Sequence, residues 1–205
     1  MSRPTAKGWC PGAYTPMMSG DGLIVRIRPR LARLTAAQAL GMCDLAQRFG
    51  SGQIDLTNRA NLQLRGVQEA NYEALLEALN QLDLLDADPA LESRRNILVS
   101  PFYERGDITE RLATALTEAL HQFPDLPAKF GFAVDTGTAP LLSKASADIR
   151  FEQDSEGLLI RADGATEGKQ ITEDTAVEEA LKLAHWFAKT RKPEQRRMAQ
   201  LTNGA

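Results

Sequence analysis

The sequence predicts an α+β fold in which a ferredoxin-like βαββαβ unit is followed by a second α/β subdomain with a mixed sheet. Strand and helix periodicities alternate up to residue 82, and a polar turn at residues 57–61 separates two strand-like runs. An acidic, breaker-rich stretch at residues 83–93 then precedes a new set of periodic segments. The 205 residues can bury about 70% of the unfolded surface, which is enough for such a core.

An extended lead-in and a strand are expected first. Residues 1–20 contain several breakers and little periodicity. Residues 22–29 alternate as a strand, with three aliphatic residues on one face and two arginines on the other: Leu23, Val25 and Ile27 against Arg26 and Arg28. The arginine face is the first contribution to a basic surface.

A helix is expected over residues 35–50. Thr35 and Gln38 have the spacing of a capping box, and Gly50 is a typical helix end. Cys43 belongs to the apolar stripe of this helix, so we expect it in the core. The stripe consists of Leu40, Met42, Cys43, Ala46 and Phe49.

The next segments complete the first unit. Residues 54–67 predict two strands joined by the polar turn, and residues 69–82 predict a second helix. The apolar face of that helix contains Tyr72, Leu75, Leu76, Leu79 and Leu82. A final strand would complete βαββαβ.

The acidic stretch is the expected boundary between two parts of the chain. It divides the sequence into a lead-in (1–20), a ferredoxin-like half domain (21–85) and an α/β subdomain (86–205). The expected elements of the last part are a short buried strand at 94–101, a helix at 107–123, a strand at 129–134, a hairpin at 147–153 and 158–162, a short strand at 169–171 and a helix at 173–192. The last helix should bury Val177, Leu181, Ala184, Trp186 and Phe187.

Composition excludes several classes of protein. No segment approaches the roughly 20 apolar residues of a membrane helix, and the N-terminus lacks the apolar core of a signal peptide, so a cytoplasmic protein is expected. Cys10 and Cys43 lie far apart and provide neither a disulfide framework nor metal-ligand spacing.

Charge is distributed unevenly along the chain. The first 67 residues carry nine Lys or Arg and three Asp or Glu, whereas the remainder carries fifteen and twenty-four. A basic first third suits an acidic small molecule or a nucleic acid. The overall negative charge and the lack of interleaved aromatic residues argue against nucleic acid.

Arg59 is the central candidate residue. It lies in the turn Thr57-Asn58-Arg59-Ala60-Asn61, and a cation at a strand end among small hydrogen-bonding side chains can hold an anion. The alternative is a hairpin whose arginines are merely solvated. Arg94 and Arg95 either bind a ligand or pair with the acidic stretch, and pairing is favoured for Arg94.

Three blocks occur in the order found in the nitrite/sulfite reductase superfamily, which the chain resembles. They are Thr57-x-Arg59-x-x-x-Gln63-x-Arg65-Gly66, then Arg95-Asn96-Ile97-Leu98, then Leu126-Pro-Ala-Lys129-Phe130. Within the superfamily, the amino-acid sequences of the first block and of residues 129–135 are most similar to those of precorrin-3B synthases of aerobic cobalamin biosynthesis. The resemblance covers about residues 10–200 and corresponds to the first half of a protein built from two similar halves. A fragment or a stand-alone half is therefore expected.

The resemblance implies which residues bind the tetrapyrrole. Arg59, Arg95 and Lys129 match basic anion-binding residues of the superfamily, and we expect them to share one open face. Precorrins and sirohaem carry several carboxylates, which the paired N–H groups of arginine match. The complete set of expected tetrapyrrole-binding residues is Arg59, Asn61, Gln63, Arg65, Arg95, Asn96 and Lys129.

The sequence also departs from the reductases. Ala60, Arg65 and Gly131 occupy positions where reductases carry Gln, His and a second catalytic lysine. These departures weaken the case for sulfite or nitrite reduction and match precorrin-3B synthase. The family's iron–sulfur cluster is held by cysteines of the second half, so this chain alone should hold no cofactor. The family implies a 4Fe-4S cluster and a tetrapyrrole, or iron, when that half is present.

The resulting hypothesis is the N-terminal half of a precorrin-3B synthase-like oxidoreductase that binds tetrapyrrole carboxylates. Whether it is an enzyme on its own stays open, because the cluster ligands are missing. The alternatives are a non-catalytic tetrapyrrole-binding or assembly module and half of a sulfite or nitrite reductase. Expected partners are a precorrin-type ligand and either a cysteine-bearing second half or a second copy in a homodimer, with neither nucleic acid nor membrane.

Overall fold

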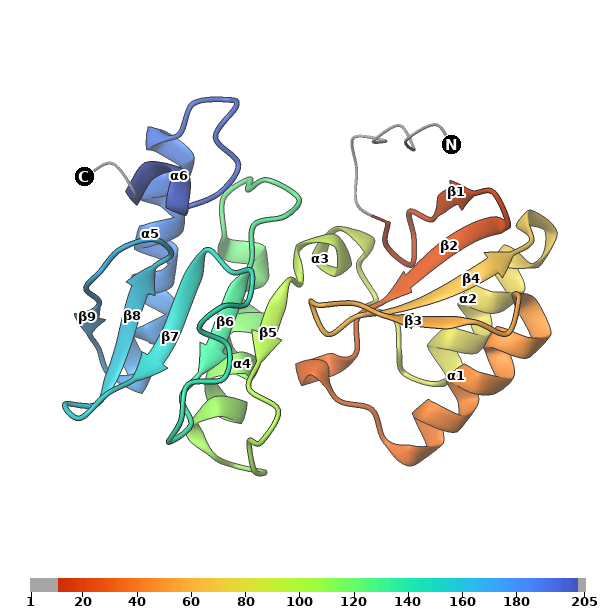
Figure 1. Ribbon diagram of the computed structural model, residues 1–205, viewed down its shortest axis with the longest axis horizontal. Coiled ribbons are helices and arrows are strands. Elements are labelled where there is room, and N and C mark those ends of the chain that lie inside the picture. Colours follow the sequence, from red (N-terminus) through yellow and green to blue (C-terminus); the bar gives the residue numbers. More distant parts are fainter. Residues whose placement is uncertain (1–10, 203–205) are drawn as a thin grey trace.

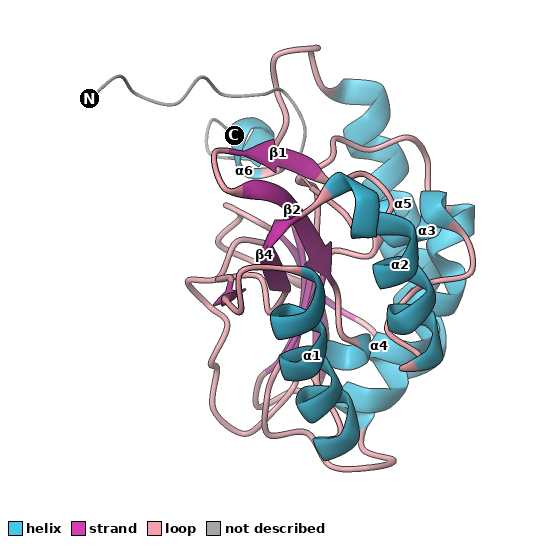
Figure 2. Ribbon diagram, turned by 90° about the vertical axis from the view of Figure 1, so that its right-hand side faces the viewer, coloured by secondary structure: helices cyan, strands magenta, loops and turns pink. Residues whose placement is uncertain are grey.

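Two β-sheets lie side by side in the computed structural model, which describes residues 11–202 (Figure 1). The helices α1 to α5 lie on one side of the strands (Figure 2). The strands of both sheets therefore turn their other side away from these helices. Residues 1–10 of the expected lead-in lie outside the described residues.

The first sheet is antiparallel and has the strand order β1-β2-β4-β3. Its strands are β1 (Met17–Ser19), β2 (Gly22–Ile27), β3 (Ile54–Leu56) and β4 (Leu62–Val67). The helices α1 (Ala36–Phe49) and α2 (Tyr72–Gln81) cover its apolar side, and short 3-10 turns lie at Arg30–Ala32 (η1) and Glu69–Asn71 (η2). The aliphatic face expected for β2 is buried in this core.

The expected final strand of the βαββαβ unit is not part of this sheet. Its edge beside β2 is occupied by β1, which comes from the lead-in and pairs antiparallel with β2. Gly22 has a φ of +129°, a conformation that glycine adopts easily, and it closes the tight turn between the two strands. A local hairpin costs less loop-closure entropy than a return from the end of α2. The chain continues from α2 into the second sheet instead.

The second sheet is mixed, as expected. Its order is β5-β6-β7-β8-β9, with parallel pairing from β5 to β7 and antiparallel pairing from β7 to β9. The strands are β5 (Ile97–Val99), β6 (Phe132–Asp135), β7 (Ile149–Gln153), β8 (Leu158–Ala162) and β9 (Lys169–Gln170). The helical segments are α3 (Pro89–Arg94), α4 (Ile108–Glu118), η3 (Ala119–Gln122), η4 (Glu173–Thr175), α5 (Ala176–Thr190) and α6 (Ala199–Thr202).

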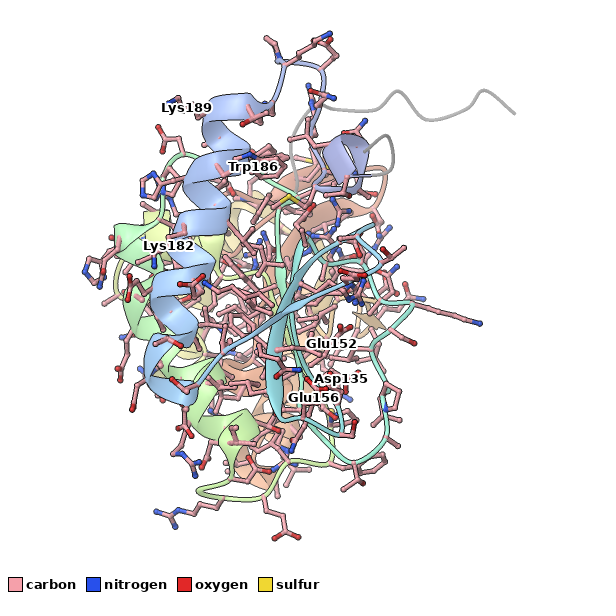
Figure 3. All side chains as sticks on the ribbon, turned by 90° about the vertical axis from the view of Figure 1, so that its left-hand side faces the viewer. Asp135, Glu152, Glu156, Lys182, Trp186 and Lys189 are labelled. Atoms are coloured by element: carbon pink, nitrogen blue, oxygen red, sulfur yellow. The ribbon has the colours of Figure 1, made fainter. Side chains whose placement is uncertain are left out.

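Two expectations about buried helix faces are wrong. Cys43 is exposed on α1, and Leu40 is 69% exposed. The buried residues of α1 are Met42, Leu45, Ala46 and Phe49. Three of them belong to the expected stripe, and Leu45 is buried in place of Leu40 and Cys43. On α5, Trp186 is 44% exposed and lies on the helix together with Lys182 and Lys189 (Figure 3).

The acidic stretch is more ordered than expected. Asp88 caps α3 by accepting a hydrogen bond from the Ala90 backbone N–H at 2.8 Å, and Pro89 occupies the first turn. This short helix brings Arg94 and Arg95 to the start of β5.

The two sheets are joined by arginines that donate to backbone carbonyls of the opposite part. Arg33 donates to the Pro101 carbonyl at 2.7 Å, and its guanidinium lies 3.4 Å from the centre of the Tyr103 ring. Arg95 donates to the Arg28 carbonyl at 2.7 Å. These contacts fix the seam between the sheets, beside which the candidate site lies.

Candidate functional site

A hollow of about 190 Å³ lies where the turn after β3 meets the loop before β6. We call it the basic pocket because it contains two arginines and a lysine. Its lining consists of Arg26, Thr57, Asn58, Arg59, Asn61, Asn96, Ala128 and Lys129. The pocket therefore draws on β2, on the polar turn, on the start of β5 and on the segment before β6.

The polar turn holds Arg59 in place. The Thr57 hydroxyl accepts the backbone N–H groups of Arg59 at 3.3 Å and of Asn61 at 3.2 Å. The Thr57 N–H in turn donates to the Asn61 carbonyl at 2.9 Å. Ala60 has a φ of +53°, so the turn passes through the left-handed region at a residue with a small side chain.

From this turn Arg59 reaches across the seam. Its guanidinium donates to the Lys129 carbonyl at 3.1 Å and to the Ser146 hydroxyl at 2.9 Å. A residue of the first sheet thus contacts two segments of the second. The guanidinium is consequently fixed beside Lys129, although the two residues lie 70 positions apart.

Asn96 holds the opposite wall of the basic pocket. Its side-chain amide donates to the carbonyls of Ala128 at 3.1 Å and Phe130 at 3.2 Å. These bonds fix the segment before β6, from which the exposed Lys129 extends. The structure thus brings together four of the expected residues, namely Arg59, Asn61, Asn96 and Lys129.

Arg95 does not line the basic pocket. It is 8% exposed, and its guanidinium forms an ion pair with Asp86 at 2.8 Å. It also donates to the carbonyls of Arg28 at 2.7 Å and Pro29 at 3.3 Å. Its contacts are those of a residue that connects α3 and β5 to the end of β2.

Arg94 pairs with a different acid from the one expected. Its guanidinium lies 2.8 Å from the Asp125 carboxylate, outside the acidic stretch of residues 83–93. Of these two neighbouring arginines, Arg95 is the one that pairs with this stretch, through Asp86. Sequence alone could not choose between these two neighbours, because the short helix α3 determines the direction of each side chain.

Arg65 and Gln63 lie on the side of β4 that faces away from the helices. Arg65 lies between two carboxylates, Asp55 at 3.5 Å and Asp21 at 3.6 Å, and does not line the basic pocket. Gln63 pairs with Arg26 across the strands β4 and β2. Arg26 was recognised from the sequence as part of a basic strand face, but it was not selected as a binding residue.

A second hollow, of about 210 Å³, lies nearby and has a buried ion pair in its wall. Arg28 and Glu92 form this pair, and both side chains are 4% exposed. Burial raises the pKa of the Glu92 carboxyl above its usual value, although the Arg28 guanidinium opposes the rise. The other walls are mostly apolar and include Phe123, Phe130 and Phe132.

Residues 11–202 contain no group of three or more His, Cys, Asp or Glu side chains arranged to hold a metal ion. Over the same range, no helix is both long and apolar enough to cross a membrane.

The part of the chain that contains the polar turn at residues 57–61 matches a known protein family. Residues 15–82 match the family described as Nitrite/Sulfite reductase ferredoxin-like half domain. The chain carries a half domain of the nitrite/sulfite reductase superfamily. This half domain spans β1 to α2 and supplies Arg26 and Arg59, whereas Asn96 and Lys129 lie beyond it.

Two named proteins are similar to most of this chain. A precorrin-3B synthase of Sinorhizobium sp is 37% identical over 153 residues, which cover 71% of this chain and 32% of that protein. A ferredoxin–nitrite reductase of Synechococcus elongatus is 27% identical over 155 residues, or 70% of this chain and 30% of that protein. The chain thus spans about a third of the length of these curated relatives.

A solved structure supports the fold over the whole chain. The Mycobacterium tuberculosis NirA protein matches with a TM-score of 0.66 and 20% identity, covering 100% of this chain and 41% of that one. The α+β architecture, with one antiparallel and one mixed sheet, is therefore an arrangement that NirA shares.

Proposed function

We propose that this chain is the N-terminal half of a precorrin-3B synthase-like oxidoreductase of aerobic cobalamin biosynthesis, and that its basic pocket binds a tetrapyrrole carboxylate. The observation that carries this proposal is the position of Arg59, which spans the seam and lies beside Lys129 in one hollow. The precorrin-3B synthase of Sinorhizobium sp is 37% identical to this chain, compared with 27% for the ferredoxin–nitrite reductase of Synechococcus elongatus.

The charge of the pocket favours an anion. Arg26, Arg59 and Lys129 are cations that line one hollow of about 190 Å³. A carboxylate in the hollow would accept charge-assisted hydrogen bonds from such groups. The side-chain amides of Asn58, Asn61 and Asn96 supply further donors around the same space.

Gly131 favours the precorrin branch over sulfite or nitrite reduction. A Cβ atom at this position would lie 2.8 Å from the Asn96 carbonyl oxygen, so a larger side chain requires the backbone to move. The resemblance places a second catalytic lysine of the reductases here. The backbone of this chain therefore has no space for that lysine.

The family implies a 4Fe-4S cluster and a tetrapyrrole, and the residues described here fit the carboxylates of the tetrapyrrole. When present, the cluster would supply electron transfer from a cysteine-bearing second half. In this proposal the chain's own residues bind and orient the ligand: Arg59 and Lys129 hold a carboxylate, and Asn96 fixes the segment that carries Lys129. The strand side that faces away from the helices is the surface proposed to receive the second half or a second copy (Figure 2).

Binding of uroporphyrin, a tetrapyrrole with acetate and propionate groups, tests this proposal. Fluorescence titration should show saturable binding to the full chain. Arg59→Met should weaken it at least about tenfold, because charge-assisted hydrogen bonds are lost. Arg48→Met is the matched control, since Arg48 is an exposed arginine on α1 and does not line the basic pocket.

The proposal fails if the unmodified chain does not bind uroporphyrin, or if Arg59→Met binds it as tightly as the unmodified chain does. Circular dichroism of each variant establishes that the fold is retained.

A further inference from the structure

The Ser146 hydroxyl joins two arginines from distant parts of the chain. Its oxygen accepts Arg59 Nη2 at 2.9 Å and Arg197 Nη1 at 2.7 Å. A hydroxyl oxygen has two acceptor positions, and these two guanidinium groups occupy both. Arg59 belongs to the basic pocket, whereas Arg197 lies 51 positions after Ser146, in the C-terminal segment that leads into α6. Ser146 is therefore a direct link between the pocket and the C-terminal segment.

A buried carboxylate holds Arg197 in turn. Asp148 is fully buried, and its Oδ1 lies 2.9 Å from Arg197 Nε. The same oxygen accepts the Met198 backbone N–H at 2.8 Å, and Arg197 Nη2 donates to the Ala147 carbonyl at 2.8 Å. Each nitrogen of the Arg197 guanidinium thus has an acceptor, which fixes the plane and the position of this group. We call Ser146, Asp148 and Arg197 the Asp148 cluster.

The Asp148 cluster also holds the segment that carries Lys129. Asp148 Oδ2 accepts the Gly131 backbone N–H at 2.9 Å, and the Asp148 backbone N–H donates to the Gly131 carbonyl at 2.7 Å. Lys129 lies two residues before Gly131, and its carbonyl accepts the Arg59 guanidinium. The cluster therefore contacts Arg59 directly and the Lys129 segment through Gly131.

We infer that the Asp148 cluster positions Arg59 for binding of a carboxylate, so that the C-terminal segment takes part in forming the basic pocket. Ser146 acts through Arg59 and is a positioning residue. A long side chain loses rotational freedom when it binds a ligand, and a guanidinium that is already held by hydrogen bonds has less freedom to lose. The inference rests on the proposed function, since it assigns residues that organise the same pocket.

Ser146→Ala removes the shared acceptor with little change in volume. We expect it to weaken uroporphyrin binding to the full chain by about fivefold in a fluorescence titration, because the Arg59 side chain must then be ordered on binding. Ser143→Ala is the matched control, since Ser143 is an exposed serine of the same loop and does not line the basic pocket. This control should bind uroporphyrin as tightly as the unmodified chain does.

A double-mutant cycle separates positioning from a general loss of structure. If Ser146 acts through Arg59, Ser146→Ala should change the uroporphyrin affinity of the Arg59→Met variant by less than about twofold, measured over a higher range of porphyrin concentration. An equal loss in the presence and absence of Arg59 would mean that the serine supports the fold and not Arg59, and the inference would be overturned.

The C-terminal end of the cluster has its own pair of variants. Arg197→Lys keeps a positive charge beside Asp148 but not the planar fork, so it should weaken uroporphyrin binding by a factor similar to that of Ser146→Ala. Arg196→Lys changes the exposed neighbouring arginine and should leave the affinity unchanged. Unchanged affinity in Arg197→Lys contradicts the part assigned to the C-terminal segment.

The outcomes distinguish the two proposals. If the unmodified chain does not bind uroporphyrin, the proposed function is wrong and the inference falls with it. If the unmodified chain binds and Ser146→Ala binds as tightly, the positioning role is overturned while the proposed function stands.

Discussion

The resemblance leads us to expect that Arg59 and Arg95 both bind an anion, but their surroundings differ. Arg59 reaches across the seam to a carbonyl and a hydroxyl at the edge of a hollow. Arg95 is 8% exposed and bonded to the Asp86 carboxylate and to carbonyls at the end of β2. The charge of an arginine can be read from the sequence, whereas its partners depend on segments distant in the chain. The two residues should therefore respond differently to substitution.

Arg95→Leu should reduce the free energy of unfolding by about 3 kcal/mol, because removing one partner of a buried ion pair leaves the other charge uncompensated. Urea denaturation of the variant and the unmodified chain measures this loss. A loss below about 1 kcal/mol together with abolished uroporphyrin binding would contradict the structural role and place Arg95 in ligand binding.

Glu92 gives a prediction about pH. Burial raises the pKa of its carboxyl above the ordinary value of 4.5, so the folded chain retains a proton that the unfolded chain has lost. The stability contributed by that proton is fully present below pH 4.5 and is lost as the pH rises through the folded-state pKa. The stability of the unmodified chain relative to Glu92→Gln should accordingly fall as the pH rises from 4.5. Denaturation curves at several pH values test this, and a difference that rises over this range contradicts it.

Helix α1 shows what periodicity can and cannot predict at the scale of an element. The capping box is confirmed, with the Thr35 and Gln38 side chains exchanging hydrogen bonds with each other's backbone. The expected stripe includes the exposed Leu40 and Cys43 and omits the buried Leu45, because apolar residues occur on more than one side of this helix. The side that packs on the sheet contains the bulky Met42 and Leu45. Propensity and capping thus locate a helix, but packing selects the face it buries.

Matched leucine truncations test the phase of α1. Leu45→Ala should cost about 2–5 kcal/mol of unfolding free energy, because Leu45 is 6% exposed and its removal leaves a cavity. Leu40→Ala on the same helix should change it by less than about 0.5 kcal/mol, since Leu40 is 69% exposed. Equal losses for the two variants would contradict the packing seen here.

At the scale of the whole molecule, the sequence predicts the α+β organisation and the mixed second sheet. It does not predict which strand pairs with the outer edge of β2. Local patterns identified β2, β4 and the hairpin of β7 and β8, since each depends on alternation over a few residues. The choice between β1 and a later strand as partner of β2 depends on loop entropy and distant packing. The basic pocket could be predicted only in part for the same reason: its turn is local, but Arg26, Asn96 and Lys129 meet through the tertiary fold. The division into segments 1–20, 21–85 and 86–205 stays a prediction.

The strand side that faces away from the helices leads to a prediction about assembly. We expect a second copy to take the place of the second half in a homodimer, because two-fold symmetric dimers are the commonest oligomers. Light scattering over a concentration series should give a mass near twice 22.5 kDa. A mass of 22.5 kDa at every concentration would exclude the homodimer and leave the second half as the proposed partner.

The central claim is that the basic pocket binds a tetrapyrrole through its carboxylates. A crystal structure of the full chain with uroporphyrin tests this most directly, because it locates each carboxylate. The account predicts a carboxylate of the ligand within hydrogen-bonding distance of Arg59 and Lys129. Porphyrin density at any other place, with the pocket containing only water, would contradict it.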